Sequence, residues 1–183
     1  MEQDLRVLGR KFKDKLGPIK VVLFDIDGIL TNGLIHWDGM EVGYNRATHA
    51  QDGYGMKLLM DAGIKVGVIS GGDSLGVKKR FEENLKLDFV FLGNEDKRKA
   101  YLKVIDLGYE DKNILYMGDE LFDIPLLKRA GFSATVPNAG HEVREAVDYV
   151  TMRKSGQACA REVMDILRYA KGIIPIIPTF ANL

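Results

Sequence analysis

Short apolar runs recur along the chain and alternate with segments whose apolar residues have helical spacing. The first run, Val21–Phe24, is apolar and rich in valine without alternation, which is typical of a strand buried on both faces of a parallel sheet. Similar runs occupy residues 65–70, 89–92, 114–117 and 133–136. This alternation predicts a Rossmann-like three-layer α/β/α sandwich with right-handed connections around a central parallel sheet.

The segments between these runs predict the helices. They cover residues 55–62, 74–85, 97–107 and 124–130, and a last helix covers 160–170. Glycines lie where helices should end, at Gly63, Gly108, Gly131 and Gly172. Near the N-terminus, helical spacing predicts a short amphipathic helix that leans on the domain through Leu5, Leu8, Phe12 and Leu16.

Two apolar segments do not fit this alternation. Residues 33–46 contain two strand-like arms around Asp38-Gly39, a pair favoured in two-residue hairpin turns, so we expect a small β-hairpin flap after the first strand. Residues 172–183 form an apolar tail that Pro175 and Pro178 keep extended. We expect the hairpin to pack in an oligomer, whereas the tail has two options: a neighbouring subunit or its own domain.

Composition limits the class of protein. A chain of 183 residues is near the size of one ordinary domain, so we expect a single domain over residues 1–183. The 26 basic residues balance 26 acidic ones, and we expect neither a nucleic-acid nor a membrane partner. The N-terminal segment lacks the apolar stretch of a signal peptide or membrane span. Cys159 is the only cysteine, so no internal disulfide can form, and we expect it in the core. These features favour a cytoplasmic protein.

Acidic residues follow two of the predicted strands. Asp25 and Asp27 end the first strand, while Asp119 and Asp123 follow residues 114–117 through Gly118. Because the carboxyl ends of parallel strands meet at one sheet edge, these four carboxylates should converge there. Their mutual repulsion calls for a cation, and hard oxygen ligands indicate Mg²⁺.

The same edge should receive groups that bind phosphate. Ser70 and Gly71 end the second strand and supply a hydroxyl and a backbone amide that can approach a phosphate closely. Lys97, at the start of a predicted helix, supplies a compensating positive charge.

Taken in order, DIDGILT, VISGG, Lys97 and GDELFD resemble the four motifs of the haloacid dehalogenase superfamily. The resemblance implies Asp25 as nucleophile and Asp27 as the acid that protonates the leaving oxygen and then activates water. It implies that Ser70, Gly71 and Lys97 bind the phosphoryl group. It also implies that Asp25, the Asp27 carbonyl and Asp119 hold Mg²⁺, with Asp123 in support.

Neither usual insertion point has room for a cap domain, so cover for the site would come from a neighbouring subunit. A chain without a cap and with such a hairpin resembles the tetrameric 3-deoxy-D-manno-octulosonate 8-phosphate phosphatases of lipopolysaccharide precursor synthesis. Three further segments resemble that subgroup: QDGYGMKLL, ISGGDSLGVKKR and SGQACAREVMDIL. The resemblance implies a homotetramer, a phosphorylated sugar-acid substrate, and substrate contacts by Asp52 and Arg161. Arg161 has the alternative of pairing with a neighbour on its own helix. The sequence departs from the subgroup at Gln51, Ser155, Ala158 and Glu120.

Three other functions compete with this one. A 9-phosphorylated nonulosonic acid or another phosphosugar is an alternative substrate for the same chemistry. A regulatory domain without turnover would keep the fold, but the intact Asp25, Asp27 and Lys97 argue against it. A phosphate-receiver domain would need an acceptor aspartate at the end of a middle strand, and FVFLGNED provides none there.

Overall fold

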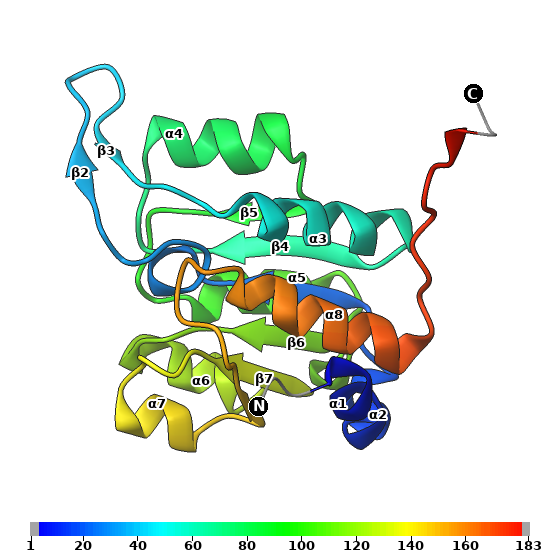
Figure 1. Cartoon of the computed structure of the whole chain (residues 1–183). Helices are drawn as coiled ribbons and strands as arrows, with labels where there is room; N and C mark the ends of the chain where they lie inside the picture. The colour runs from blue at the N-terminus through cyan, green and yellow to red at the C-terminus, as the bar shows by residue number, and fades with distance from the viewer. Residues whose placement is uncertain (1–3, 181–183) are drawn as a thin grey trace.

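The computed structural model describes residues 4–180, and a six-stranded sheet forms their centre (Figure 1). Its strands run in the order β5-β4-β1-β6-β7-β8, and every neighbouring pair is parallel. Their bounds are Val21–Phe24 for β1, Lys65–Ile69 for β4, Phe89–Phe91 for β5, Ile114–Met117 for β6, Phe132–Thr135 for β7 and Tyr149–Val150 for β8. The parallel sheet that the apolar runs predict is therefore confirmed.

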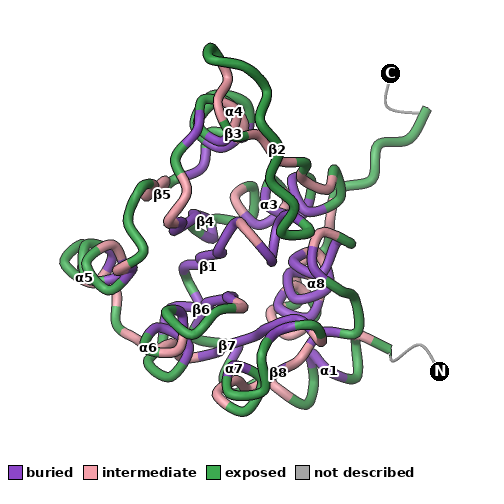
Figure 2. Tube along the Cα trace, turned by 90° about the vertical axis from the view of Figure 1, so that its left-hand side faces the viewer, coloured by how far each residue is buried: buried purple, intermediate pink, exposed green. Residues whose placement is uncertain are grey.

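Helices cover both faces of this sheet (Figure 2). One face carries α1 (Leu5–Lys11), α2 (Lys13–Leu16), α3 (Ala50–Asp61) and α8 (Cys159–Lys171), and the other carries α5 (Arg98–Asp106) and α6 (Ile124–Leu127). The shorter elements are α4 (Leu75–Lys78), which continues into η2 (Lys79–Asn84), the turns η1 (Ile26–Leu30), η3 (Asp111–Asn113) and η4 (Leu121–Asp123), and α7 (His141–Glu145). The three-layer sandwich is confirmed.

The core lies between these layers. All four residues of β1 and of β6 are fully buried, as strands covered on both faces must be. Leu8 and Leu16 of the N-terminal helices are buried as well, so the amphipathic helix does lean on the domain. Each such leucine contributes about 2 kcal/mol through removal of its side chain from water.

One expected helix start is wrong, and two short elements were not predicted. Helix α3 begins at Ala50 instead of residue 55, with His49 capping it by accepting from the Gln51 amide. Its glycines suggest a loop, yet Gly55 provides close packing against α8, since an added Cβ would lie 2.7 Å from Met164. Strand β8 and helix α7 are also absent from the prediction because they are too short to show a period.

The hairpin forms, but not with a two-residue turn. Its strands are β2 (His36–Trp37) and β3 (Tyr44–Asn45), joined by the wide loop 38–43. Trp37 pairs with Tyr44, and their rings meet edge to face with centroids 5.2 Å apart. This cross-strand aromatic contact sets the register, so Asp38 and Gly39 become the start of a longer loop.

The remaining expectations concern what surrounds the sheet edge. In the described residues, only η1, the hairpin and α3 lie between β1 and β4, and only α4 and η2 lie between β4 and β5, so neither position holds a cap domain. The tail after α8 is extended and projects away from the sandwich (Figure 1). Across residues 4–180, we find no helix with the length and apolar character needed to cross a bilayer.

Candidate active site

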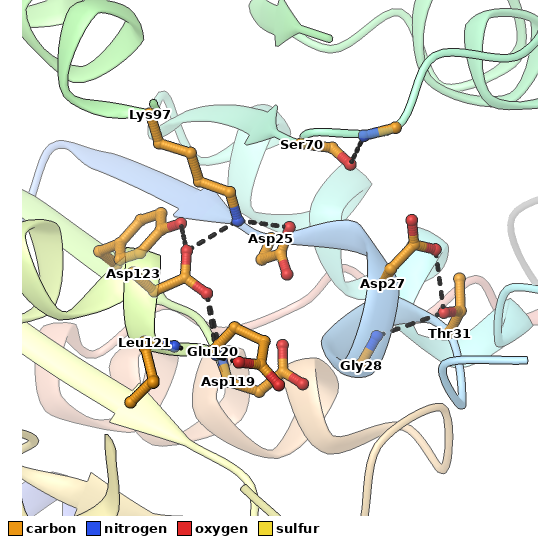
Figure 3. Close-up of polar contacts among 12 residues, drawn as sticks. Asp25, Asp27, Gly28, Thr31, Ser70, Lys97, Asp119, Glu120, Leu121 and Asp123 are labelled. Atoms are coloured by element: carbon orange, nitrogen blue, oxygen red, sulfur yellow. Dashed lines mark hydrogen bonds and ion pairs between the residues drawn. The ribbon is translucent and has the colours of Figure 1, made fainter. Parts of the chain in front are cut away.

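The sheet topology brings three chain segments to one edge. Strand β1 lies between β4 and β6, and the chain order reverses at this point, because β4 and β5 extend one way and β6 to β8 the other. Ligand sites in open α/β sheets lie at the carboxyl ends of the strands at such a reversal. Asp25, Ser70 and Asp119 therefore come together there (Figure 3).

Lys97 joins two of the acidic residues. Its Nζ lies 2.7 Å from Oδ1 of Asp25 and 2.7 Å from Oδ1 of Asp123, and its side chain has no exposed surface. Lys97 precedes α5, the helix that follows edge strand β5. Since removing one partner of a buried ion pair costs about 3–5 kcal/mol, these contacts hold the lysine firmly at the end of β1.

Asp123 is the best-satisfied carboxylate of the site. Besides Lys97, its Oδ1 accepts from the Tyr116 hydroxyl at 2.5 Å. Its Oδ2 accepts from the backbone amides of Asp119 at 3.2 Å and Glu120 at 3.1 Å (Figure 3). Asp123 thus fixes both the lysine and the loop that carries Asp119.

Asp119 approaches the first motif through a glycine. Gly28 has a φ of +93°, and a Cβ built there would lie 1.9 Å from Oδ2 of Asp119. Only glycine both tolerates this backbone conformation and leaves room for the carboxylate. The glycine of DIDG is therefore what lets the carboxylate of GDELFD lie against the turn after Asp27.

The electrostatics show a deficit of positive charge. Burial raises the pKa of Asp25 well above its ordinary value, and Lys97 opposes this only in part. Burial, followed by the charge of Asp123, raises the pKa of Asp119 to about 7. Burial disfavours the charged form of Lys97, but Asp25 and Asp123 outweigh it, so the pKa of Lys97 is raised. One ammonium group does not neutralise three carboxylates.

These residues fit a divalent cation. Ligand oxygens of Asp25, Asp119 and Asp123 lie within 4.8 Å of one another. Oδ1 of Asp119 is buried and has no hydrogen-bond partner among the described residues. Because Asp123 is already occupied by Lys97 and Tyr116, Asp25 and Asp119 are the carboxylates that would hold the ion. A site with oxygen donors suits Mg²⁺.

Asp27 lies beside this cluster and is more exposed than Asp25. Its Oδ1 accepts from Thr31 Oγ1 at 3.4 Å and lies 2.6 Å from Nε of Arg46 (Figure 3 shows the Thr31 contact). Arg46 follows β3 of the hairpin, and the sequence gives no signal for it, because no motif or period includes it. Tyr116 is also absent from the predicted site, although a hydroxyl inside the apolar run ILYM was a usable signal.

Ser70 and Gly71 follow β4, the neighbour of β1. Ser70 is buried, and its Oγ accepts from the Gly72 amide at 3.1 Å, which turns the hydroxyl toward the end of the sheet (Figure 3). Gly71 lies against Glu95, whose Cγ would be 3.0 Å from an added Cβ. The hydroxyl is thus available beside Asp25.

The two residues expected to contact substrate have hydrogen-bond partners on α8. Asp52 in α3 is buried and accepts from the Arg161 amide of α8 at 2.7 Å. The Arg161 guanidinium pairs with Asp165, one turn along its own helix, at 2.9 Å. In residues 4–180, no hydrogen bond or ion pair connects either side chain to the Asp25 cluster. Nearby, Ala158 has a φ of 60°, which explains why a glycine is expected there.

Comparison with known proteins agrees with this geometry. A family model described as haloacid dehalogenase-like hydrolase matches residues 90–163. The parallel sheet, the aspartates after β1 and β6, and Lys97 define a hydrolase of this class. The 3-deoxy-D-manno-octulosonate 8-phosphate phosphatase KdsC of Haemophilus influenzae is 34% identical over 168 residues, which cover 91% of this chain and 92% of that protein. The chain belongs to the KdsC family.

Solved structures show the same similarity. The cobalt-bound deoxy-D-mannose-octulosonate 8-phosphate phosphatase of Haemophilus influenzae superposes with a TM-score of 0.81 at 36% identity, over 86% of this chain and 92% of that chain. The 3-deoxy-D-manno-octulosonate 8-phosphate phosphatase of Moraxella catarrhalis, in complex with magnesium ion, phosphate ion and KDO, superposes with a TM-score of 0.83 at 32% identity. The match covers 89% of this chain and 93% of that chain.

Proposed function

We propose that this protein is a Mg²⁺-dependent phosphomonoester hydrolase that works through an aspartyl-phosphate intermediate. The observation that carries the proposal is the buried Lys97, 2.7 Å from both Asp25 and Asp123, with Asp119 beside it. A phosphoryl transition state spreads negative charge over its oxygens, so its catalysts are positioned cations and a well-placed nucleophile.

In the first step, a carboxylate oxygen of Asp25 attacks phosphorus. The bond between phosphorus and the ester oxygen breaks, and Asp27 gives its proton to the leaving oxygen. Ser70, the Gly71 amide and Lys97 bind the phosphoryl oxygens. Asp123 acts through Lys97, which it holds in place.

In the second step, Asp27 accepts a proton from water, which attacks the phosphorus of the aspartyl phosphate. Inorganic phosphate leaves, and the Asp25 carboxylate is regenerated. Asp25, the backbone carbonyl of Asp27 and Asp119 are the groups that would hold Mg²⁺. When bound, this ion supplies positive charge that offsets the repulsion between the carboxylates and the phosphate.

The proposed substrate is 3-deoxy-D-manno-octulosonate 8-phosphate, which would yield the free sugar acid and phosphate in lipopolysaccharide precursor synthesis. The names of the relatives from Haemophilus influenzae and Moraxella catarrhalis support it. Substrate contacts by Asp52 and Arg161 would require approach from the α3 and α8 side. A 9-phosphorylated nonulosonic acid is the second candidate, because Gln51 and Ala158 depart from the subgroup's residues.

We further propose that residues 1–183 act as one catalytic domain within a cytoplasmic homotetramer. The hairpin exposes apolar side chains that suit burial between subunits, with Leu34 at 70% and Met40 at 90% exposure. The tail does the same, because Ile176 is 91% exposed. Docking of residues 172–183 on a neighbouring subunit would bury this surface. The lone, buried Cys159 supports a reducing compartment.

The test is phosphate release from a panel of esters with and without Mg²⁺. The panel contains the octulosonate 8-phosphate, a 9-phosphorylated nonulosonate and glucose 6-phosphate. We expect strong selectivity for the octulosonate, lost when Mg²⁺ is chelated. Preference for the nonulosonate would keep the chemistry and reject the substrate, and release from none of them would favour a regulatory domain without turnover.

A further inference from the structure

Arg46 connects the base of the hairpin to Asp27. Its side chain is only 5% exposed, and its Nε lies 2.6 Å from Oδ1 of Asp27. The approach is electrostatic, because its angle does not satisfy a hydrogen bond and Nε lacks a hydrogen-bond partner among the described residues. A second nitrogen of the guanidinium, Nη1, donates to Oγ of Ser74 at 3.2 Å.

The local backbone fixes Arg46 in this place. Oδ1 of Asn45 accepts from the Arg46 amide at 2.9 Å, and the Asn45 side-chain amide donates to Asp38 at 2.9 Å across the hairpin. Ser74 caps α4 by accepting from the Val77 amide. The arginine therefore spans three separate segments: the hairpin, the start of α4 and the turn after β1.

Gly72 provides the space for this arrangement. A Cβ at this position would lie 2.8 Å from Nη2 of Arg46 and 3.1 Å from Oδ2 of Asp27. Any side chain at residue 72 would therefore have to share the space of the guanidinium. Gly72 comes two residues after Ser70, so the pocket for the Arg46 guanidinium adjoins the proposed phosphate-binding loop.

The two oxygens of Asp27 consequently have different surroundings. Oδ1 lies 2.6 Å from Nε of Arg46 and accepts from Thr31, whereas Oδ2 accepts no hydrogen bond from any of residues 4–180. We propose that Arg46 is a positioning residue that fixes Asp27 through Oδ1 and leaves Oδ2 as the atom that carries the proton. This inference rests on the proposed function, since it assigns the atom through which Asp27 acts.

The proton balance explains why such positioning matters. As the bond between phosphorus and the ester oxygen breaks, the electron pair stays on that oxygen and the proton on Oδ2 moves to it. Asp27 is left as a carboxylate beside the Arg46 guanidinium, so the charge it gains has a fixed partner. An alkyl phosphate needs this proton, whereas a nitrophenyl phosphate does not, because nitrophenolate is a stable leaving group.

This difference in leaving group provides the test. The rate of leaving-group release in the first turnover is measured with an alkyl phosphate and with p-nitrophenyl phosphate, both with Mg²⁺. For Arg46→Ala we expect the rate of leaving-group release to fall roughly 10- to 100-fold with the alkyl ester and less than about threefold with the nitrophenyl ester. General acid catalysis typically accelerates a reaction by about 10²- to 10⁴-fold, and Arg46→Ala should remove part of that acceleration. KM should change little.

Three further variants test whether the loss comes from the Arg46 guanidinium. Arg46→Lys keeps the charge and should recover part of the alkyl ester rate, while Gly72→Ala should reproduce the loss by displacing the guanidinium. Arg6→Ala removes an arginine from an exposed ion pair with Asp4 and should change neither rate. An equal loss on both esters, or an effect confined to KM, would overturn the positioning role.

A second measurement does not depend on turnover. The melting temperatures of Arg46→Ala, Asp27→Ala and the double variant form a cycle, and coupling of the pair predicts that the double variant loses less than the two single variants together. Additive losses would overturn the inference. If wild-type protein hydrolyses no ester but the cycle shows coupling, the proposed function fails while the Arg46–Asp27 pair stands.

Discussion

The acidic residues of the site differ in how completely their oxygens are satisfied. Asp123 accepts from Lys97, Tyr116 and two backbone amides, so its lone pairs are committed within the protein. Asp119 has a buried oxygen with no hydrogen-bond partner among the described residues. Hydrogen bonding thus separates a carboxylate that supports the site from one that is free to bind a cation.

A buried carboxylate outside this cluster predicts a pH dependence of stability. Burial raises the pKa of Asp52 from 3.8 to about 6, although the hydrogen bond from the Arg161 amide lowers this pKa in part. The folded protein therefore binds a proton that the unfolded chain has lost, and stability falls as pH rises from about 4 to 6. Above pH 6 the free energy of unfolding is lower by about 3 kcal/mol than below pH 4 because of this pKa difference. Asp52→Asn should remove that decline.

Urea unfolding at several pH values tests the Asp52 prediction. The stability of Asp52→Asn relative to wild type should increase between pH 4 and pH 7. Asp106→Asn, an exposed aspartate on α5, serves as the control and should show a constant difference. A constant difference for Asp52→Asn as well would contradict the effect of burial.

At the scale of elements, the strands were the most predictable part of the fold. A strand such as β1 is buried on both faces, so its sequence is a continuous apolar run with a polar end. The loop of the hairpin was not predictable, because the contact between Trp37 and Tyr44 competes with the local preference of Asp38-Gly39. Helix α3 was shortened in the prediction because its glycines suggest a loop, whereas Gly55 provides close packing against α8.

The candidate site also contains residues that the sequence predicts and residues that it does not. Asp25, Ser70 and Asp119 were predictable because each follows a strand, and parallel strands bring their carboxyl ends together. Arg46 was not, since its place depends on how a hairpin folds back over the sheet edge. Asp52 and Arg161 were grouped with the site by resemblance. In the structure Asp52 accepts from the Arg161 amide, between α3 and α8, and the Arg161 guanidinium pairs with Asp165 within α8.

The turn after β1 predicts a metal-binding variant. In Gly28→Ala, the added Cβ would collide with the Asp119 carboxylate, so we expect Mg²⁺ affinity to fall by about 10- to 100-fold. Gly33→Ala is the matched control, because Gly33 also has a positive φ of +79° but nothing within 4 Å of an added Cβ. Calorimetric titration with Mg²⁺ measures both.

The two glycine variants should share one cost. Each places a non-glycine residue in the left-handed region, at about 1–2 kcal/mol of stability. Only Gly28→Ala should lose metal affinity in addition. If Gly33→Ala weakened Mg²⁺ binding as much, backbone strain rather than contact with Asp119 would explain the effect.

At the scale of the whole molecule, the site edge and the exposed apolar surface are related. No cap domain lies at either insertion point of the described chain, and the hairpin beside the site exposes Leu34, Met40 and Tyr44. Apolar surface of this kind is typical of a contact between subunits. This exposed surface supports the proposal that a neighbouring subunit covers the site.

This arrangement predicts a variant that separates the subunits. Leu34→Asp combined with Met40→Asp should convert the proposed tetramer to smaller species in sedimentation velocity, because both side chains are exposed in the single chain. Folding should be unaffected for the same reason. Leu107→Asp changes an exposed leucine next to α5 and should leave the assembly intact. An unchanged tetramer in the double variant would place the interface elsewhere.

The most direct test of the account is to trap the covalent intermediate. During turnover of an alkyl phosphate with Mg²⁺, the protein is treated with borohydride, which reduces an aspartyl phosphate to homoserine, and its peptides are analysed by mass spectrometry. We predict homoserine at residue 25, and none in Asp25→Asn, which should release no phosphate. Homoserine at another aspartate, or phosphate release by Asp25→Asn at the wild-type rate, would contradict Asp25 as the nucleophile.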